Sequence, residues 1–469
     1  MLPHPHKGKA ISKAVETCLL DWGLNKLSTI TLDNARNNDR CVEDLKKRFN
    51  KRGGLLLEGE FFHVRCFAHI INLVVRDGIY EIRDTVKKLR RSVKYVRSSP
   101  SRLQMFRKCA SEERIVSKKS ICLDVKTRWN STYLMIGAAM QYQKAFERLE
   151  EQDASYKIEV NAKEIGTLEE SDWRTLKVIH TFLEDFYLLT KRISGSYYIT
   201  SNTYFDEVGS IKNLLLDYIN SEDPFFRDMA IKMNTKFDKY CDISSMNQIL
   251  VVALVLDPRY KLQYVEYWYG TYISKNRWYL SEEEKEQCVF DFVENIKVVM
   301  SRLYCHYKLE NDSFVDIDSR RATNRCGEVV TNPVGIVDKR ALMKKGFSNY
   351  LKRNENVEAM NDLDRYLLDG VEELDDTNFD VLLWWKNKVP TYRALTIMAR
   401  DILAIPVTSV ASECAFSTSK RVLDQFRSSL TPKTVESLVC AQDWLKSSKL
   451  MVDSEETLEN LEGIEKGIF

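Results

Sequence analysis

The first 81 residues change hydrophobic period repeatedly, which constrains the fold more than any other feature of the sequence. Gly8 to Leu24 has apolar residues at helical spacing, whereas Lys26 to Leu32 is short and rich in β-branched residues, as is typical of a buried strand. A second helix follows, then Glu60 to Cys66 alternates like another strand, and Phe67 to Val75 is an apolar helix. Helices that alternate with strands predict an α/β unit over residues 1–81.

Beyond that unit, the apolar residues follow helical spacing almost throughout. Composition divides this part into a helical region with a basic segment, a polar linker, a helical and acidic connector, a C-terminal region with two amphipathic helices, and an acidic tail. The predicted bounds are 82–309, 310–338, 339–391, 392–449 and 450–469. The sequence therefore predicts an α+β fold that is predominantly α.

Composition excludes several broad classes of protein. No apolar run approaches the roughly 18 residues of a membrane span, and the opening MLPHPHKGK lacks the apolar core of a secretory signal. The eleven cysteines are scattered without a CxxC pair, so reduced thiols inside the cell are expected. We predict no membrane partner and no small-molecule substrate.

The net charge of +2 is small, but the charges are unevenly distributed. Arg83 to Arg128, here called the basic segment, holds fifteen Lys and Arg against four Asp and Glu, whereas Glu355 to Asp380 holds ten acids against one base. Such asymmetry indicates a surface that faces a polyanion, although the cations could also be the solvated faces of helices. The candidate phosphate ligands include Lys87, Lys88, Arg90 and Arg91.

Lys126, Arg128 and Trp129 form a second candidate for nucleic-acid binding. Two cations beside an indole can hold phosphates while the ring stacks on an exposed base. The alternative is a tryptophan that anchors a helix in the core. Residue type and spacing fit both interpretations.

Two positions near the predicted strands could bind a metal. Asp33 follows the first strand, where α/β sheets present ligands, so it could hold Mg²⁺ or form an ordinary N-cap or Asx-turn. Cys66 and His69 have i, i+3 spacing at the next strand-to-helix junction. A structural zinc site needs four ligands, and no second pair has suitable spacing, so packing or hydrogen bonding is the alternative.

The last third of the chain holds two further candidates. Glu413 lies near the start of a helix after the loop from Pro406, where it could simply complement the helix dipole. The two amphipathic helices could fill the chain's own core or pair two chains. Their apolar residues are Leu395, Met398, Ile402, Leu438, Val439 and Leu445.

The chain resembles the hAT superfamily of cut-and-paste transposases, in particular its plant RICESLEEPER and DAYSLEEPER-like branch. The resemblance rests on five motifs that occur in the family's order over about residues 5–450. They are TLDNARNND around Asp33, HVRCFAHIINLVV around Cys66 and His69, TRWNSTYLM around Trp129, LVLDPRYKL around Asp257, and IPVTSVASECAFSTSKRVLDQFRSSLTPKTVESLVCAQDWL.

The resemblance implies a ribonuclease-H-like core interrupted by a large all-helical insertion, followed by a hAT dimerisation region. In the family three acidic residues bind two divalent metals, and Asp33 matches the second and Glu413 the third. Cys66 and His69 match the family's CxxH motif, and Trp129 matches its Arg-Trp motif near the DNA. No residue matches the first Asp. The zinc-binding BED finger and three core strands also have no counterpart, so the core is expected to be incomplete.

The first Asp is expected to bridge both metals, so its absence predicts that this chain does not cleave DNA and needs no metal or other cofactor. We expect a transposase-derived, catalytically inactive nuclear protein that binds DNA and forms a homodimer. The alternative is a genuine Mg²⁺-dependent transposase whose BED finger and first catalytic Asp are missing from this sequence. A helical interaction scaffold is the third interpretation, and it leaves the basic segment unexplained.

Overall fold

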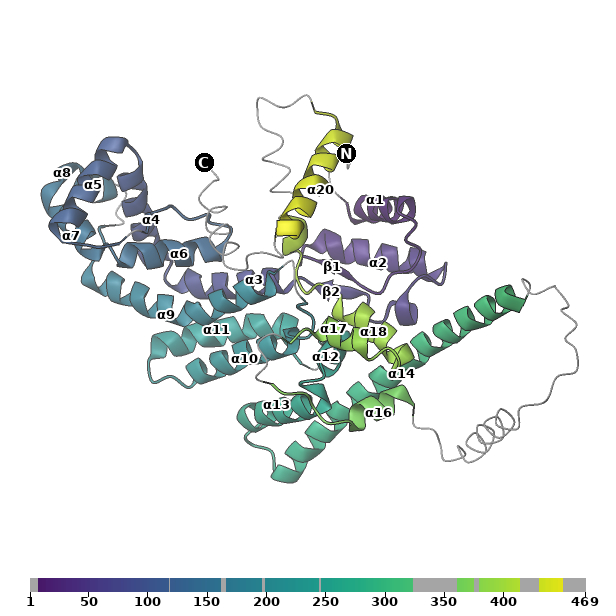
Figure 1. The fold of residues 1–469 in the computed structure, drawn as a ribbon. Helices are drawn as coiled ribbons and strands as arrows, with labels where there is room; N and C mark the ends of the chain where they lie inside the picture. The colour runs from purple at the N-terminus through teal and green to yellow at the C-terminus, as the bar shows by residue number, and fades with distance from the viewer. Residues whose placement is uncertain are drawn as a thin grey trace, which may run out of the picture.

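The computed structural model describes residues 7–117, 119–161, 166–195, 199–243, 246–323, 361–374, 379–413 and 430–449. Helices dominate these ranges, and their one sheet has two strands (Figure 1). None of the helices described there is long and apolar enough to cross a bilayer. The predicted fold class, α+β and predominantly α, is confirmed.

The sheet and the helices around it form the N-terminal unit. Its elements are α1 (Gly8–Asp21), β1 (Ile30–Leu32), α2 (Arg36–Asn50), the short 3-10 helix η1 (Leu56–Gly59) and β2 (His63–Arg65). The strands are parallel, with Thr31 opposite Val64, so α2 and η1 make the crossover that parallel strands require. Leu45, Phe49 and Phe62 fill a small core with the apolar face of α1. The predicted order of helices and strands is confirmed.

A long helical region follows the sheet. Its elements are α3 (Phe67–Glu81), α4 (Arg83–Arg97), α5 (Pro100–Glu112), α6 (Trp129–Met140), α7 (Gln143–Gln152), α8 (Ala154–Asn161), α9 (Glu170–Ile193), α10 (Tyr204–Ile219), α11 (Pro224–Cys241), α12 (Gln248–Val255), α13 (Lys261–Asn276) and α14 (Glu282–Thr323). α3 packs against α9 and α11 and carries the chain from the sheet into this bundle. Figure 1 shows α4, α5, α7 and α8 as a lobe at the end of the bundle remote from the sheet.

α14 corrects the predicted linker. The polar composition of residues 310–338 predicts a break, but the helix continues to Thr323. Its preceding turns are anchored because Ile296, Met300 and Leu303 are buried against neighbouring helices, and a nucleated helix extends at little cost. The rest of the predicted linker, residues 339–360 of the predicted connector and the acidic tail lie outside the described residues.

The C-terminal elements return to the centre of the molecule. They are α16 (Asp362–Leu368), α17 (Val381–Asn387), α18 (Arg393–Leu403) and α20 (Pro432–Lys449). α18 packs against α12 and α14. The chain after α18 then runs beside the sheet, where the backbone N–H of Phe67 donates to the carbonyl of Val407 at 2.9 Å.

Candidate functional site

The carboxyl ends of β1 and β2 meet at one edge of the sheet, because the strands are parallel and in register. Asp33 follows β1 and Cys66 follows β2. The backbone N–H of Cys66 donates to the carbonyl of Leu32 at 2.8 Å. The residues that follow the two strands are therefore neighbours.

Local hydrogen bonds hold Asp33 at this edge. Its Oδ1 accepts from the backbone N–H of Ala35 at 2.9 Å and from Nδ2 of Asn38 at 2.6 Å. The first bond is an Asx-turn, which directs the chain from β1 into α2. The Asx-turn interpretation is confirmed, and the metal-binding role stays a prediction.

Arg65 adds a cation to the same edge. Its Nη1 donates to Oδ1 of Asn34 at 3.2 Å, and its Nη2 pairs with Asp39 at 3.1 Å. Both bonds join β2 to the residues after β1. Sequence reasoning missed Arg65 and Asn38, although their place within the TLDNARNND and HVRC motifs was a signal.

The segment after α18 brings Glu413 to this edge. Thr31 Oγ1 donates to the carbonyl of Pro406 at 2.6 Å, and the backbone N–H and Oγ of Ser409 both lie 3.3 Å from Cys66 Sγ. Ser409 Oγ also donates to Glu413 Oε1 at 3.1 Å. Glu413 is thus joined through Ser409 and Cys66 to the strand that precedes Asp33. The two acidic residues predicted to act together are thus on segments that both contact this edge of the sheet.

Cys66 has a structural role in this arrangement. Its side chain is buried, and its sulfur accepts a hydrogen bond from the backbone N–H of Ser409 at 3.3 Å. The interpretation of packing and hydrogen bonding is therefore confirmed for Cys66. His69 lies half-buried on the first turn of α3. Within the described ranges, no three His, Cys, Asp or Glu side chains gather as a metal site would require.

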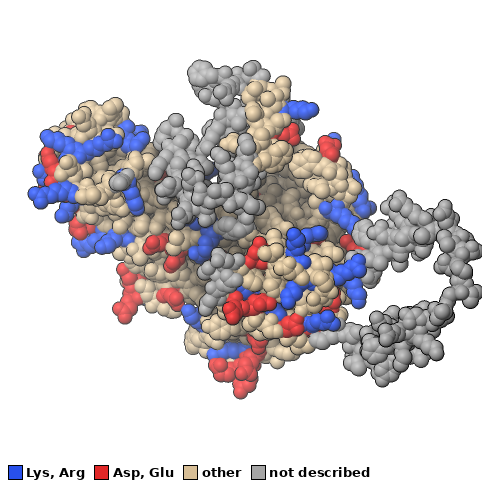
Figure 2. All heavy atoms as spheres, viewed as in Figure 1, with Lys and Arg blue, Asp and Glu red and all other residues tan. Residues whose placement is uncertain are grey.

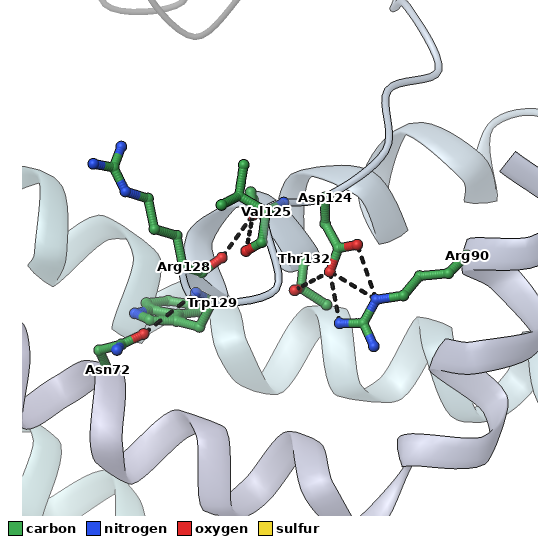
Figure 3. A network of polar contacts seen from close by, with 8 residues as sticks. Asn72, Arg90, Asp124, Val125, Arg128, Trp129 and Thr132 are labelled. Carbon is green, nitrogen blue, oxygen red and sulfur yellow. Dashed lines mark hydrogen bonds and ion pairs between the residues drawn. The ribbon is translucent and has the colours of Figure 1, made fainter. Parts of the chain in front are cut away.

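The structure corrects the predicted role of Trp129. The side chain is only 3% exposed, and it packs edge-on against Tyr133 with ring centroids 6.3 Å apart. Its backbone N–H points to Oδ1 of Asn72 on α3 at 3.4 Å (Figure 3). An indole enclosed between α6 and α3 cannot stack on a base, so the core alternative is correct. Arg128, one residue earlier, is exposed and extends away from this packing (Figure 3).

Several of the predicted phosphate ligands have protein partners instead. Nε and Nη2 of Arg90 bind the carboxylate of Asp124 at 2.7–3.0 Å, and Thr132 donates to the same carboxylate at 2.6 Å (Figure 3). Asp124 is buried, so this charge-assisted pair fixes the α5–α6 connection against α4. Sequence reasoning missed Asp124, because its partner lies 34 residues away.

Lys88 also forms an ion pair within the protein. It pairs with Asp172 at 2.7 Å, and Thr85 donates to the other carboxylate oxygen at 2.8 Å. Burial alone would raise the pKa of Asp172, but the hydrogen bonds from Lys88, the backbone of Glu169 and Thr85 outweigh burial and lower it. This pair ties α4 to α9, which removes Lys88 from the predicted DNA-binding set.

The other predicted cations differ in how open they are to a ligand. Lys87 is exposed but pairs with Asp84 at 2.8 Å, and Arg91 donates to the carbonyl of Val160 at 3.1 Å. Lys126 and Arg128 are exposed, and no carboxylate among the described residues pairs with them. The same holds for four cations that were not singled out from the sequence: Lys94, Arg107, Arg114 and Lys119. Figure 2 shows Lys and Arg gathered over the lobe that contains α4 and α5.

The predicted dimerisation residues fall into two groups. Leu395, Met398 and Ile402 are fully buried in the chain's own core, because α18 lies against α12 and α14. This corrects the expectation that the apolar face of α18 stays open for a partner. On α20, Leu438 is 44% exposed and Val439 is half-buried. The side chain of Leu445 lies outside the described part.

Four family models match the chain in order. They are the ZBED1 RNase-like domain over residues 1–61, the ZBED1 RNase-like helical domain over 64–182, the hAT-like transposase RNase-H fold over 202–307, and the hAT family C-terminal dimerisation region over 362–445. The last match begins within the predicted connector. A ribonuclease-H-like fold combined with this C-terminal region defines a transposase-related protein.

Curated relatives agree with this class. The chain is 35% identical to the rice protein RICESLEEPER 2, 34% to a putative AC transposase of Zea mays and 30% to Arabidopsis thaliana DAYSLEEPER. These alignments cover 95–96% of the chain but only 60%, 52% and 58% of the relatives. The chain belongs to the hAT superfamily of transposase-related proteins, among RICESLEEPER and DAYSLEEPER-like members, and spans a little over half the length of these relatives.

Proposed function

We propose that this chain is a transposase-derived nuclear protein that binds DNA through its basic segment, self-associates through its C-terminal region and does not cleave DNA by itself. The observation that carries the proposal is the set of exposed cations in the basic segment without carboxylate partners among the described residues. Relatives named as BED zinc-finger proteins and as a transposase support DNA as the ligand and the nucleus as the location.

Electrostatics explains how the basic segment would bind DNA. The exposed cations occur on α4, on α5 and in the α5–α6 connection, and α4 packs against α5. Cations without a fixed anion can exchange their counterions for phosphates, which favours binding without reading sequence. The Arg90–Asp124 pair supports the last part of this surface, because it fixes the loop that leads to Lys126 and Arg128.

We expect the affinity for duplex DNA to depend steeply on salt and to weaken when exposed cations of the basic segment are removed together. Each phosphate contact contributes about 0.9 to the slope of log K against log salt, so removing four should lower its magnitude by up to ~3.6. Fluorescence anisotropy at several salt concentrations would measure this slope. The four substitutions change the following residues to Gln: Arg107, Lys119, Lys126 and Arg128.

A matched control removes four exposed lysines from other helices. It should leave the slope close to that of the unchanged chain, although both variants have the same net charge. Equal slopes for the two variants would show that binding depends on net charge and not on the basic segment. The control residues are also exposed and have no carboxylate partner among the described residues; each changed to Gln, they are Lys13, Lys177, Lys191 and Lys308.

Self-association through α20 is the second part of the proposal. The hAT dimerisation model covers most of this helix, and α18 is buried, so the exposed apolar residues of α20 are the favoured contact. We expect Leu438→Asp to weaken the dimer at least about tenfold, equivalent to ~1.4 kcal/mol. Light scattering over a range of concentrations would measure the change. Leu188, also 44% exposed but on α9, gives the control Leu188→Asp, which should leave the dimer intact.

Absence of cleavage is the third part. The sheet edge has Asp33 and Glu413, and Asp33 already accepts two hydrogen bonds through Oδ1. A two-metal site needs a carboxylate shared by both ions, and Arg65 places a positive charge beside the same edge. These features support binding without strand cleavage for these 469 residues.

The alternative is a metal-dependent transposase in which a further segment supplies the first carboxylate. The observation that favours it is the contact between the loop that carries Glu413 and the edge of the sheet that Asp33 follows. We expect no nicking of supercoiled DNA by the purified chain in Mg²⁺ or Mn²⁺. Metal-dependent nicking that Asp33→Ala or Glu413→Ala abolishes would establish the alternative and refute the proposal.

A further inference from the structure

A cavity of about 520 Å³ lies along the outer edge of β2, opposite the edge that pairs with β1. Asn247 defines this edge, because its Nδ2 donates to the carbonyls of Phe61 and His63 at 3.0 and 3.1 Å. The walls come from α2, β2, the end of α11 and the start of α12. The polar lining includes Lys46, His63, Arg65, Lys239, Asn247 and Gln248.

The charges around the cavity are predominantly positive. Lys46 and Lys239 have no carboxylate partner among the described residues, and Arg65, which pairs with Asp39 at 3.1 Å, is the third cation in the wall. Glu60 is the carboxylate that lines the cavity, and it pairs with Arg302. An anion that entered would therefore meet two lysines whose charges no fixed carboxylate balances.

Two further features favour an anion here. α12 begins at the cavity wall, so the positive end of its dipole adds to the field of the lysines. Burial, with the charge of Arg65, lowers the pKa of His63, so its ring is neutral at pH 7 and the positive charge resides on the lysines and Arg65. The Nε2 atom of His63 is buried without a hydrogen-bond partner among the described residues, which leaves polar capacity unused beside the cavity.

The size and lining define the class of ligand. Cavities of about 300–1,000 Å³ hold small molecules and cofactors, whereas a DNA duplex is too wide to enter. The half-buried Tyr240 supplies ring surface beside the cations, a combination that suits a base or another flat group joined to a phosphate. We infer that this cavity binds a phosphate ester of about mononucleotide size. The inference assigns a ligand but no reaction, so it is compatible with the sequence-based expectation of no small-molecule substrate.

Calorimetry on the full chain tests the inference with AMP, inorganic phosphate and adenosine. AMP should bind saturably, phosphate should compete with it, and adenosine should bind at least about tenfold more weakly. Lys46→Gln combined with Lys239→Gln should weaken AMP binding tenfold or more. Lys47→Gln, an exposed neighbour on α2 that does not line the cavity, is the matched control and should leave it unchanged.

Two comparisons complete the test. A short 5′-phosphorylated oligonucleotide that displaces AMP would identify a strand end as the source of the phosphate, and one that does not would identify a free nucleotide. The variant with four substitutions in the basic segment should bind AMP normally. A failed AMP-binding inference can therefore be distinguished from a failed proposal of DNA binding. Absence of saturable AMP binding, equal affinity for adenosine, or an unaffected lysine double variant would overturn the inference.

Discussion

Replacing Trp129 by Ala is expected to destabilise the protein strongly and to leave the DNA affinity of the folded chain unchanged. The side chain is buried between α6 and α3 and contacts Tyr133. Truncating a buried Trp costs about 3–5 kcal/mol, from lost transfer free energy and the cavity left behind. Denaturant unfolding followed by circular dichroism would measure the loss in the transition that involves the helical region.

Two variants make this prediction specific. Trp278 is 78% exposed in the turn between α13 and α14, so Trp278→Ala should change the unfolding free energy by no more than ~0.5 kcal/mol. Arg128→Gln should weaken DNA binding without affecting unfolding. A Trp129→Ala protein with normal stability and reduced DNA affinity would contradict this prediction. It would indicate that the Trp129 ring stacks on a base.

Trp129 also shows which distinction could not be made from the sequence alone. Lys126, Arg128 and an adjacent indole fit a nucleic-acid contact and a core anchor equally well, since both need the same residue types. The distinction depends on α3, whose Asn72 lies 57 residues away. The same holds for Lys88 and Arg90, whose positive charges counted toward DNA binding until their distant carboxylate partners were known.

The order of helices and strands in the N-terminal unit was predictable, because it does not depend on distant residues. The order of helices and strands depends on local period and composition, and β1, α2, β2 and α3 each have a clear pattern. Asp33 could be placed after a strand by the same local argument. The approach of the loop before Glu413 to the sheet could not be predicted in this way, because the contact that holds it there joins residues 375 apart. Only the family resemblance related the two acidic residues before the structure was known.

Asp257, in the LVLDPRYKL motif, is the centre of another contact set that local patterns did not reveal. It is fully buried immediately after α12. Nε and Nη2 of Arg259 donate to its two oxygens at 3.0 and 2.8 Å, and Asn202 donates at 2.8 Å. The motif thus forms a satisfied buried ion pair at the junction of α12 and α13.

The junction of α12 and α13 also binds α16 and α17 through hydrogen bonds. Tyr366 Oη and Trp385 Nε1 donate to the carbonyls of Val255 and Leu256, each at 2.8 Å. These are carbonyls at the end of α12, which the helix itself cannot satisfy. Lys261 donates back to the carbonyl of Tyr366 at 2.8 Å. The position of α16 and α17, and hence of the chain that leads to Glu413, depends on this junction.

Asp257→Ala is therefore expected to destabilise the chain by about 3–5 kcal/mol, because it removes a buried carboxylate that accepts hydrogen bonds from both Arg259 and Asn202. Asp257→Ala combined with Arg259→Met should recover part of that loss, since the double variant replaces both members of the ion pair. Denaturant unfolding would measure both, and limited proteolysis should cut the segment containing α16 and α17 faster in the single variant. Asp228→Ala removes an exposed carboxylate from α11 and should change neither readout. A single variant as stable and as resistant as this control would show that the pair does not hold the C-terminal elements in place.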